Sequence, residues 1–289
     1  ARASLALAEL ERGSVSAGLA AQAAEEAQAL GAREVAAQAQ ALLREVDQPE
    51  VTLVCLGGFR IELASEPVPG AAWQSRKARD LVKLLVCRRG RPIHREQLAE
   101  ILWPDVDPAR TANRLSVALS TVRTIVDPEH RHAPDHYLRI DGDAVALANT
   151  TIDVEQFLHN AGAGLAAARS GRVGDARRYL EAAELAYAGD LFEDDLYAEW
   201  AVDLREKARM TYLDVARALA DLAGDDHEAR SRYQLRILER DPFDERAHLD
   251  LVALLADDGR HGEARRRYRL YSRRMDEIDV EAAPYPADR

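Results

Sequence analysis

The segment RTANRLSVALSTVRTIV, residues 110–126, has the pattern of a helix with two different faces. At 100° per residue, Leu115, Leu119, Val122 and Val126 fall on one apolar stripe, as in a helix packed on a core. The segment contains no acidic residue, whereas an ordinary solvated helix would carry glutamates on its outer face. The side chains opposite the stripe, or flanking it, are Arg110, Asn113, Arg114, Val117, Ser120, Thr121, Arg123 and Thr124.

Two further helices are predicted just before this segment. SRKARDLVKLLVCRRG (75–90) has a core stripe of Ala78, Leu81 and Leu85 and ends at Arg88, Arg89 and Gly90. HREQLAEILWPD (94–105) is stopped by Pro104. Asp107 and Pro108 then provide an N-cap and a first-turn proline, so residues 110–126 form the third helix.

Predicted strands lie on both sides of the three helices. VTLVCLGGFRIEL (51–63) is dense in β-branched and aromatic residues and predicts a hairpin or short strands. HYLRI (136–140) and AVAL (144–147) flank the sequence DGD, which indicates a tight hairpin. The order strands, three helices, hairpin describes a winged helix-turn-helix, in which the third helix enters the DNA major groove.

The remainder of the chain is predicted to be helical and to contain a repeat. Gly224 and Gly259 are 35 residues apart, and so are Ala229 and Ala264. This period is close to that of tetratricopeptide arrays, whose stacked helix pairs form concave surfaces. We expect a mainly α fold with a small β component, in three parts: a helical segment at 1–48, a winged-helix domain at 49–150 and tetratricopeptide-like repeats at 151–283.

Charge is distributed unevenly along the 289 residues. The net charge is −11, which by itself is the wrong sign for a phosphate partner. Residues 51–150, however, carry 14 basic and 12 acidic side chains, whereas residues 151–289 carry 21 and 30. No apolar run approaches the ~18 residues that a membrane span needs, and Cys55 and Cys87 lie in apolar segments typical of buried, reduced thiols. We therefore expect a cytoplasmic protein without a membrane partner.

Several motifs resemble, in order, those of the SARP-type transcriptional activators. They run through residues 51–271 and are GGFRIEL, the two helices ending in LWPD, ANRLSVALSTVR, HYLRI, IDVEQF, AYAGDLFED, EW and ERDPFDERAHLDLVALLADDGRHGEARRRY. The resemblance implies a response-regulator-like winged helix followed by a helical bacterial transcriptional activation domain. The extra helical segment at the start implies upstream repeats or a sensor in a longer chain.

Two sets of residues are predicted to contact DNA. Arginine pairs with guanine, asparagine with adenine, and a small apolar side chain with the thymine methyl group. Basic and hydroxyl groups near helix starts and on the hairpin suit phosphates, although Tyr137 could equally pack the hairpin onto the core. The base-contacting set is Arg110, Asn113, Arg114, Val117 and Ser120; the backbone-contacting set is Ser75, Arg76, Arg79, Arg95, Thr121, Tyr137 and Arg139.

No enzyme, cofactor or metal site is expected. The sequence lacks the glycine-rich, nucleophile-elbow and zinc-helix motifs. His130, His132 and His136 lie near Asp127 and Asp135, but their spacing fits no standard metal site, and we expect a loop over DNA or polymerase. Trp73 and Trp103 are expected mainly in the core.

Two functions remain as alternatives. The first is a transcriptional activator that binds double-stranded promoter DNA through the winged helix and RNA polymerase holoenzyme or a regulator through the repeats. The second is an interaction scaffold whose winged helix binds protein. Whether one protomer or two bind stays open, and a dimer on direct repeats is compatible with the first.

Overall fold

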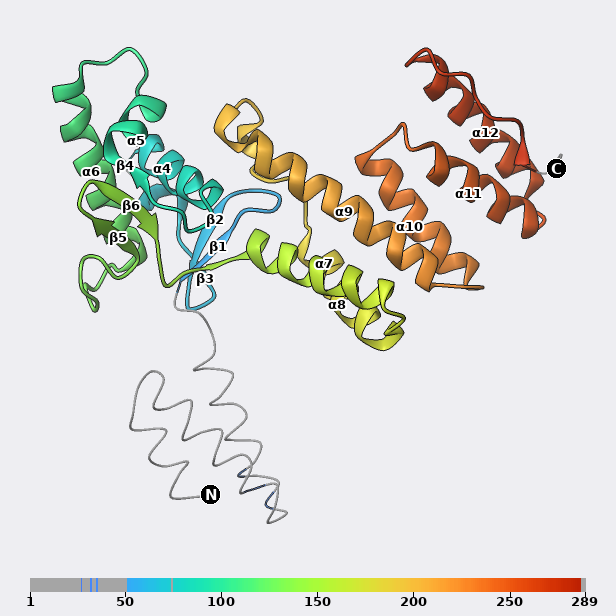
Figure 1. Ribbon diagram of the computed structural model, residues 1–289, viewed down its shortest axis with the longest axis horizontal. Coiled ribbons are helices and arrows are strands. Elements are labelled where there is room, and N and C mark those ends of the chain that lie inside the picture. Colours follow the sequence, from blue (N-terminus) through green and yellow to red (C-terminus); the bar gives the residue numbers. More distant parts are fainter. Residues whose placement is uncertain (1–26, 28–31, 33–34, 36–50, 74, 287–289) are drawn as a thin grey trace. The chain divides into compact units, whose positions relative to one another are not determined.

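The computed structural model describes residues 27, 32, 35, 51–73 and 75–286, with Pro108 and Ala109 described by their backbone alone. The helical segment expected at 1–48 therefore lies outside the described residues, apart from three positions. The described chain is mainly helical with short strands, which confirms the predicted fold class (Figure 1). Over these residues, none of the helices has the length and apolar character required to cross a membrane.

The chain divides into two compact units. Unit 1 contains residues up to Leu53 and Arg60–Thr151, and unit 2 contains Val54–Phe59 and Ile152–Arg289. The short segment Val54–Phe59, which the sequence analysis placed in the winged-helix domain, thus groups with the helical unit. The chain passes from one unit to the other at three points.

Unit 1 has a small helical core with two sheets beside it. Its sheets are ordered β3-β2-β1-β7 and β4-β6-β5. Its elements are β1 (Val51–Val54), β2 (Arg60–Leu63), β3 (Glu66–Pro67), η1 (Gly70–Ala72), α4 (Arg76–Cys87), β4 (Ile93–His94), α5 (Arg95–Leu102), α6 (Pro108–Val126), β5 (Leu138–Asp141) and β6 (Ala144–Leu147), and β7 (Thr151–Ile152) lies at the boundary with unit 2.

The three helices and the hairpin of unit 1 form as predicted. Ala78, Leu81 and Leu85 of α4 are buried, and α5 ends at Leu102, two residues before Pro104. Strands β5 and β6 pair antiparallel, with Leu138 opposite Leu147 and Asp141 opposite Ala144. Strand β4 was not predicted; its residues Ile93 and His94 pair with Val145 and Ala144 and fix the hairpin to the start of α5.

Unit 2 is a succession of antiparallel helix pairs. Contacts join α7 to α8, α8 to α9, α9 to α10, α10 to α11 and α11 to α12. A core cluster of Leu213, Ile237, Leu251, Val252 and other apolar residues is shared by the last four helices. The elements are α7 (Asp153–Arg169), α8 (Val173–Ala186), η2 (Glu193–Asp195), η3 (Glu199–Ala201), α9 (Val202–Leu222), α10 (His227–Arg240), α11 (Glu245–Asp257) and α12 (His261–Asp276).

The 35-residue period is the distance in sequence between two successive helix pairs, α9–α10 and α11–α12. Gly224 follows α9 with φ +57° and Gly259 follows α11 with φ +74°. Both take the left-handed conformation that ends a helix and that glycine adopts without steric cost. Because each glycine ends the first helix of a pair, the sequence period is the period of the structure.

Asp153, from the IDVEQF motif, ties the segment 54–59 to α7. One carboxylate oxygen accepts the N–H groups of Cys55 at 2.8 Å and Leu56 at 3.0 Å, and the other accepts that of Val154 at 2.6 Å. Burial raises the pKa of Asp153, although the three N–H donors partly offset this effect. The motif is therefore structural, and it holds an early segment of the chain in unit 2.

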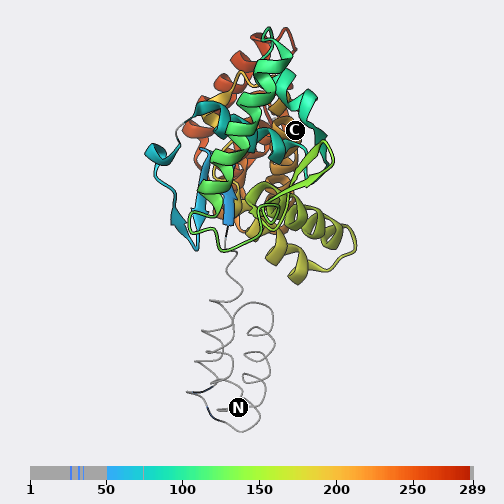
Figure 2. The ribbon, with the colours of Figure 1, turned by 90° about the vertical axis from the view of Figure 1, so that its left-hand side faces the viewer.

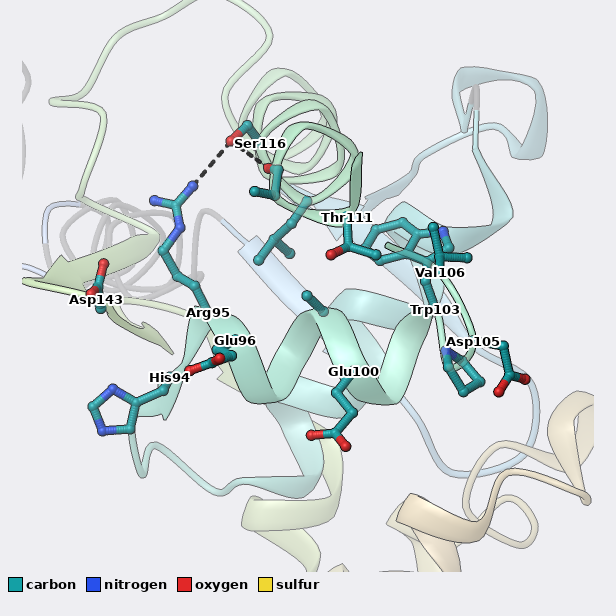
Figure 3. A pocket seen from close by; sticks show the side chains of 14 residues that line it. His94, Arg95, Glu96, Glu100, Trp103, Asp105, Val106, Thr111, Ser116 and Asp143 are labelled. Atoms are coloured by element: carbon teal, nitrogen blue, oxygen red, sulfur yellow. Dashed lines mark hydrogen bonds between the residues drawn. The ribbon is translucent and has the colours of Figure 1, made fainter. Parts of the chain in front are cut away.

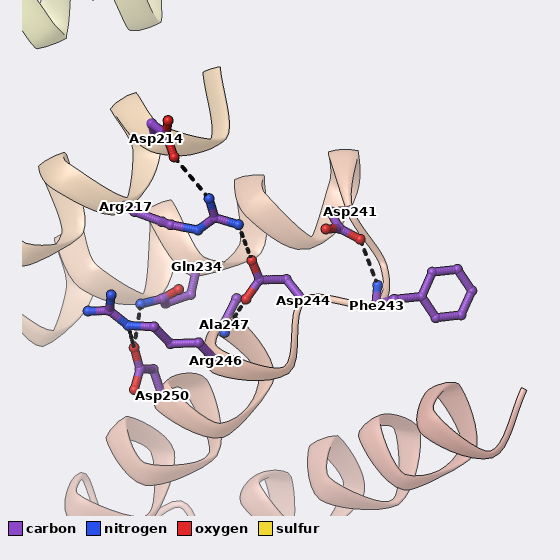
Figure 4. A network of polar contacts seen from close by, with 9 residues as sticks. All are labelled: Asp214, Arg217, Gln234, Asp241, Phe243, Asp244, Arg246, Ala247 and Asp250. Carbon is purple, nitrogen blue, oxygen red and sulfur yellow. Dashed lines mark hydrogen bonds and ion pairs between the residues drawn. The ribbon is translucent and has the colours of Figure 1, made fainter. Parts of the chain in front are cut away.

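The DPFDERAH motif is also structural. Asp244 caps α11 by accepting the N–H of Ala247 at 2.8 Å, and its other oxygen accepts from Arg217 of α9 at 2.6 Å (Figure 4). Arg217 also reaches Asp214 at 3.1 Å. Buried His248 lies with Nε2 3.0 Å from the carbonyl of Pro242. The motif thus fixes the start of one repeat against the helix of the repeat before it.

Candidate nucleic-acid interface

The two faces of α6 are as the sequence predicts. Leu115, Leu119, Val122 and Val126 are between 0 and 5 % exposed, and Ala118 and Ile125 widen the buried stripe. On the other face Val117 is 57 % exposed, and α6 lies on the outside of unit 1 in both views (Figure 2). The exposed residues of that face are Arg110, Asn113, Arg114, Val117, Ser120 and Thr124, with Thr121 half-buried at its side.

The start of α6 is fixed by Asp107. Its carboxylate accepts the N–H of Arg110 at 3.4 Å, and its carbonyl accepts from Thr111 at 3.0 Å. The first turn of α6 contains no acidic side chain. The positive end of the helix dipole therefore adds to the charge of Arg110 and Arg114, and this end of the helix suits an anionic partner.

Two hydroxyl groups on this side of α6 donate hydrogen bonds to backbone carbonyls of the same helix. Thr121 Oγ1 donates to the carbonyl of Val117 at 3.0 Å, and Thr124 Oγ1 donates to that of Ser120 at 3.2 Å. Threonines that bond in this way present their lone pairs and methyl groups outward. Thr121 is therefore suited to accept a hydrogen bond or to make an apolar contact.

Most of the residues predicted to contact the DNA backbone lie at helix starts. Ser75 is the N-cap residue of α4, its hydroxyl makes no capping hydrogen bond, and Arg76 follows it at the surface. Arg79 is half-buried and already has partners within the protein. Arg95, at the start of α5, donates to Ser116 Oγ of α6 at 3.2 Å, so it positions the two helices against each other.

The two residues predicted to contact DNA from the hairpin, Tyr137 and Arg139, differ in their exposure. Arg139 of β5 is exposed. Tyr137 is 5 % exposed, and its ring meets those of His132 and His136 edge-on, with centroids 5.4 and 4.6 Å away. The burial of its ring favours the alternative in which Tyr137 packs within the protein. His132 and His136 stack on each other at 4.2 Å.

A crevice beside the exposed face of α6 was missed by the sequence analysis. It has a volume of about 250 Å³ and is lined by Val117, Ser120, Thr121, Thr124 and Ile125 of α6 together with Ala72 of η1. Residues 70–72 show no periodic pattern, so no sequence signal places them beside α6. The crevice adds an apolar wall to a polar face.

A larger cavity of about 740 Å³ lies between α5 and α6 (Figure 3). On α6 it is lined by Thr111, Ala112, Leu115 and Ser116, which point away from Arg114 and Val117. The charged residues that line it are Arg95, Glu96, Glu100, Asp105 and Asp143, and His94 also lines it. Four carboxylates and one guanidinium disfavour a phosphate ligand there. Trp103 lines this cavity and is only half-buried, as is Trp73, so neither is a full core residue.

Among the described residues, no group of three or more His, Cys, Asp or Glu side chains is placed to hold a metal ion. Cys55 is buried and Cys87 is half-buried, and they form no disulfide with each other.

Comparisons with known proteins identify the helical unit. Residues 152–285 match the model of the bacterial transcriptional activator domain. The transcriptional regulatory proteins EmbR of Mycobacterium bovis and Mycobacterium tuberculosis are 27 % identical over 146 residues, which are 48 % of this chain and 35 % of theirs. This chain therefore spans about a third of the length of those relatives.

A solved structure shares the fold. Mycobacterium tuberculosis EmbR in complex with a low-affinity phosphopeptide superimposes with a TM-score of 0.65 at 23 % identity, covering 82 % of this chain and 62 % of that one. This likeness shows that the two chains share a fold. The resemblance to the SARP-type transcriptional activators is confirmed by the match of residues 152–285 to the bacterial transcriptional activator domain and by the EmbR relatives.

Proposed function

We propose that the chain is a sequence-specific DNA-binding transcriptional activator and that α6 reads bases in the major groove. The observation that carries this proposal is the exposed face of α6, which has two arginines, an asparagine, a valine and hydroxyl groups but no carboxylate. Arg110, Asn113, Arg114, Val117 and Ser120 are the proposed base contacts. Ser75, Arg76, Arg139 and Thr121 are the proposed contacts to the DNA backbone, with Arg79 and Arg95 supporting the helices that carry them.

The distribution of charge supports attraction of DNA by unit 1 and not by the chain as a whole. The chain carries −11 overall, so association depends on the basic residues of unit 1 and should be sensitive to salt. Selection of bound duplexes from a random pool, followed by titration at several salt concentrations, tests the proposal. We expect a defined sequence to be enriched and the affinity to fall steeply with salt. Absence of sequence enrichment would contradict a base-reading role for α6.

Unit 2 is the part that we propose contacts RNA polymerase or a regulatory partner. Stacked helix pairs present extended surfaces, and the match of residues 152–285 is to an activator domain. An upstream sensor or repeat region of a longer chain and a dimer on direct repeats belong to the same proposal. Transcription measured at matched promoter occupancy, with and without substitutions on exposed residues of unit 2, separates activation from DNA affinity.

The alternative of a protein-binding scaffold makes a different prediction for the selection of bound duplexes. A winged helix that binds only protein has no need of an α6 face without carboxylates. Because such a protein would not bind DNA, duplex DNA would not displace its partner. Loss of partner binding without any DNA selectivity would favour the scaffold.

A further inference from the structure

An exposed acidic segment lies between α8 and α9 and includes the first two residues of α9. Residues 190–203, here called the acidic loop, contain six carboxylates and no lysine or arginine. Two apolar side chains project from this loop into solvent: Leu196 is 58 % exposed and Tyr197 is 98 % exposed. The carboxylates are those of Asp190, Glu193, Asp194, Asp195, Glu199 and Asp203. Asp190 accepts the hydroxyl of Tyr187 and Glu193 pairs with Arg240 at 3.6 Å, whereas Glu199 and Asp203 are exposed beside Tyr197.

The backbone of the acidic loop is held in place from inside. Arg205, only 8 % exposed, donates to the carbonyls of Leu191 at 2.9 Å, Asp195 at 2.9 Å and Leu196 at 3.2 Å. Phe192 is fully buried with φ +53°. A fully exposed tyrosine on a loop fixed by a buried guanidinium is pre-organised to contact a partner, because little conformational entropy remains to be lost there.

The last helix of unit 2 carries the opposite charge. α12 contains six arginines against two acidic residues. Arg266, Arg269 and Arg273, here called the arginine stripe, are exposed and fall on one side of the helix at the i, i+3, i+7 spacing. None of the three makes an ion pair with another residue in the part of the chain that the structure describes.

The two surfaces cannot neutralise each other within one molecule. The acidic loop adjoins the start of α9, whereas α12 is the last helix, and Figure 1 shows these two elements at opposite ends of unit 2. A contact between them therefore requires two copies of the chain. A surface that meets a different surface on the partner is a head-to-tail contact.

We propose that unit 2 associates head to tail with a second copy, the acidic loop of one copy docking on the arginine stripe of the other. Guanidinium groups pair with the exposed carboxylates of Glu199 and Asp203, and Tyr197 offers its ring face to one arginine. The same chain already places Arg265 over Tyr285 and Arg178 over Tyr179, at 5.4 and 4.5 Å from the ring centroids. Exposed charge pairs contribute little each, so the association is weak and weakens with salt.

Complementation between two variants of the full chain tests this arrangement, followed by sedimentation velocity at low ionic strength. The stripe variant carries Arg266→Glu and Arg269→Glu, and the loop variant carries Tyr197→Ala and Glu199→Arg. Each alone should self-associate at least tenfold more weakly than the parent protein. An equimolar mixture should restore a 1:1 complex, because the intact loop of one variant meets the intact stripe of the other.

A control variant carries Arg169→Glu on α7 and Leu185→Ala on α8, which change an exposed arginine and an 84 % exposed leucine outside both surfaces. Its self-association should equal that of the parent protein. Far-UV circular dichroism establishes that all variants fold.

Three outcomes would overturn the proposal. The parent protein could remain monomeric up to about 1 mM, a range in which weak contacts still populate dimers. The mixture of variants could fail to associate, which would exclude a head-to-tail contact. Finally, the stripe variant could lose affinity for duplex DNA while keeping its self-association, which would make α12 a phosphate contact. The sedimentation measurements need no DNA, so their failure leaves the proposed function intact.

Discussion

Removal of the Asp244 side chain should destabilise unit 2 by an amount that its contacts define. Asp244→Ala deletes the N-cap of α11, worth about 1 kcal/mol, and the charge-assisted hydrogen bond to Arg217, worth roughly 1.5–3 kcal/mol. The Asp244 side chain is 7 % exposed and that of Arg217 is 29 % exposed, so solvent screens the pair only partly. Because Arg217 keeps Asp214, we expect a loss near the lower end of the sum, about 2–3 kcal/mol.

One companion variant separates the cap from the charge, and a second serves as an exposed control. Asp244→Asn keeps a good N-cap and loses only the ionic contact, so it should cost about half as much as Asp244→Ala. Asp221→Ala removes an ion pair with Arg246 in which both side chains are more than 60 % exposed, and it should change stability by less than about 0.5 kcal/mol.

Urea unfolding followed by far-UV circular dichroism measures the three changes. We expect midpoints lowered by about 1 M for Asp244→Ala and by about half of that for Asp244→Asn. If Asp244→Ala and Asp221→Ala proved equally mild, the buried network would contribute no more than an exposed pair. The reasoning from burial would then be wrong.

Three further predictions concern the interface and pH. Arg114→Ala should weaken specific DNA binding by about 1–3 kcal/mol and relax the preference at one base position, as read from selected duplexes; a uniform loss on all sequences would make it a phosphate contact. Val117→Ala should reduce discrimination between thymine and uracil at a single operator position, measured by substituting each thymine, and equal discrimination in both proteins would remove Val117 from the base contacts. Burial lowers the pKa of His248, so its neutral form is favoured in the fold; unit 2 should keep full stability above about pH 6.5 and lose stability as the pH falls below that value. Melting temperatures at several pH values, with His248→Gln giving a flatter profile, measure this effect.

Helical periodicity and turn chemistry predicted the helices and the hairpin that carry the candidate interface. The alternation of Leu115, Leu119 and Val122 with polar residues depends only on helix geometry, so it specifies a buried and an exposed face without knowledge of the partner elements. The Asp141-Gly142 sequence predicted the hairpin between β5 and β6 for a similar reason, because a two-residue turn is a local property of the chain.

Features that depend on distant residues were not predictable in this way. The two-residue strand Ile93–His94 has no periodic signal, and it forms because β6 offers it hydrogen-bonding partners. The wall that Ala72 adds beside α6 depends on how η1 packs. Tyr137 illustrates the limit: an aromatic residue on a wing suits either DNA or the core, and the sequence alone does not show its contacts with His132 and His136, which favour packing.

Because the two units are interleaved in sequence, the proposed role of unit 2 in activation cannot be tested by cutting the chain between them. Cys55 and Leu56 of unit 2 precede the winged-helix residues in sequence, and their N–H groups are bonded by Asp153. A chain cut near residue 151 would remove Asp153 and uncover Leu56 and Phe59, which are 2 and 5 % exposed. Uncovered apolar side chains and unsatisfied N–H groups both destabilise a fragment. Loss of activity in such a fragment would therefore report misfolding as readily as loss of an activating surface. Substitutions at exposed residues such as Tyr197 leave these contacts intact, and they are the changes from which a role of unit 2 in activation can be inferred.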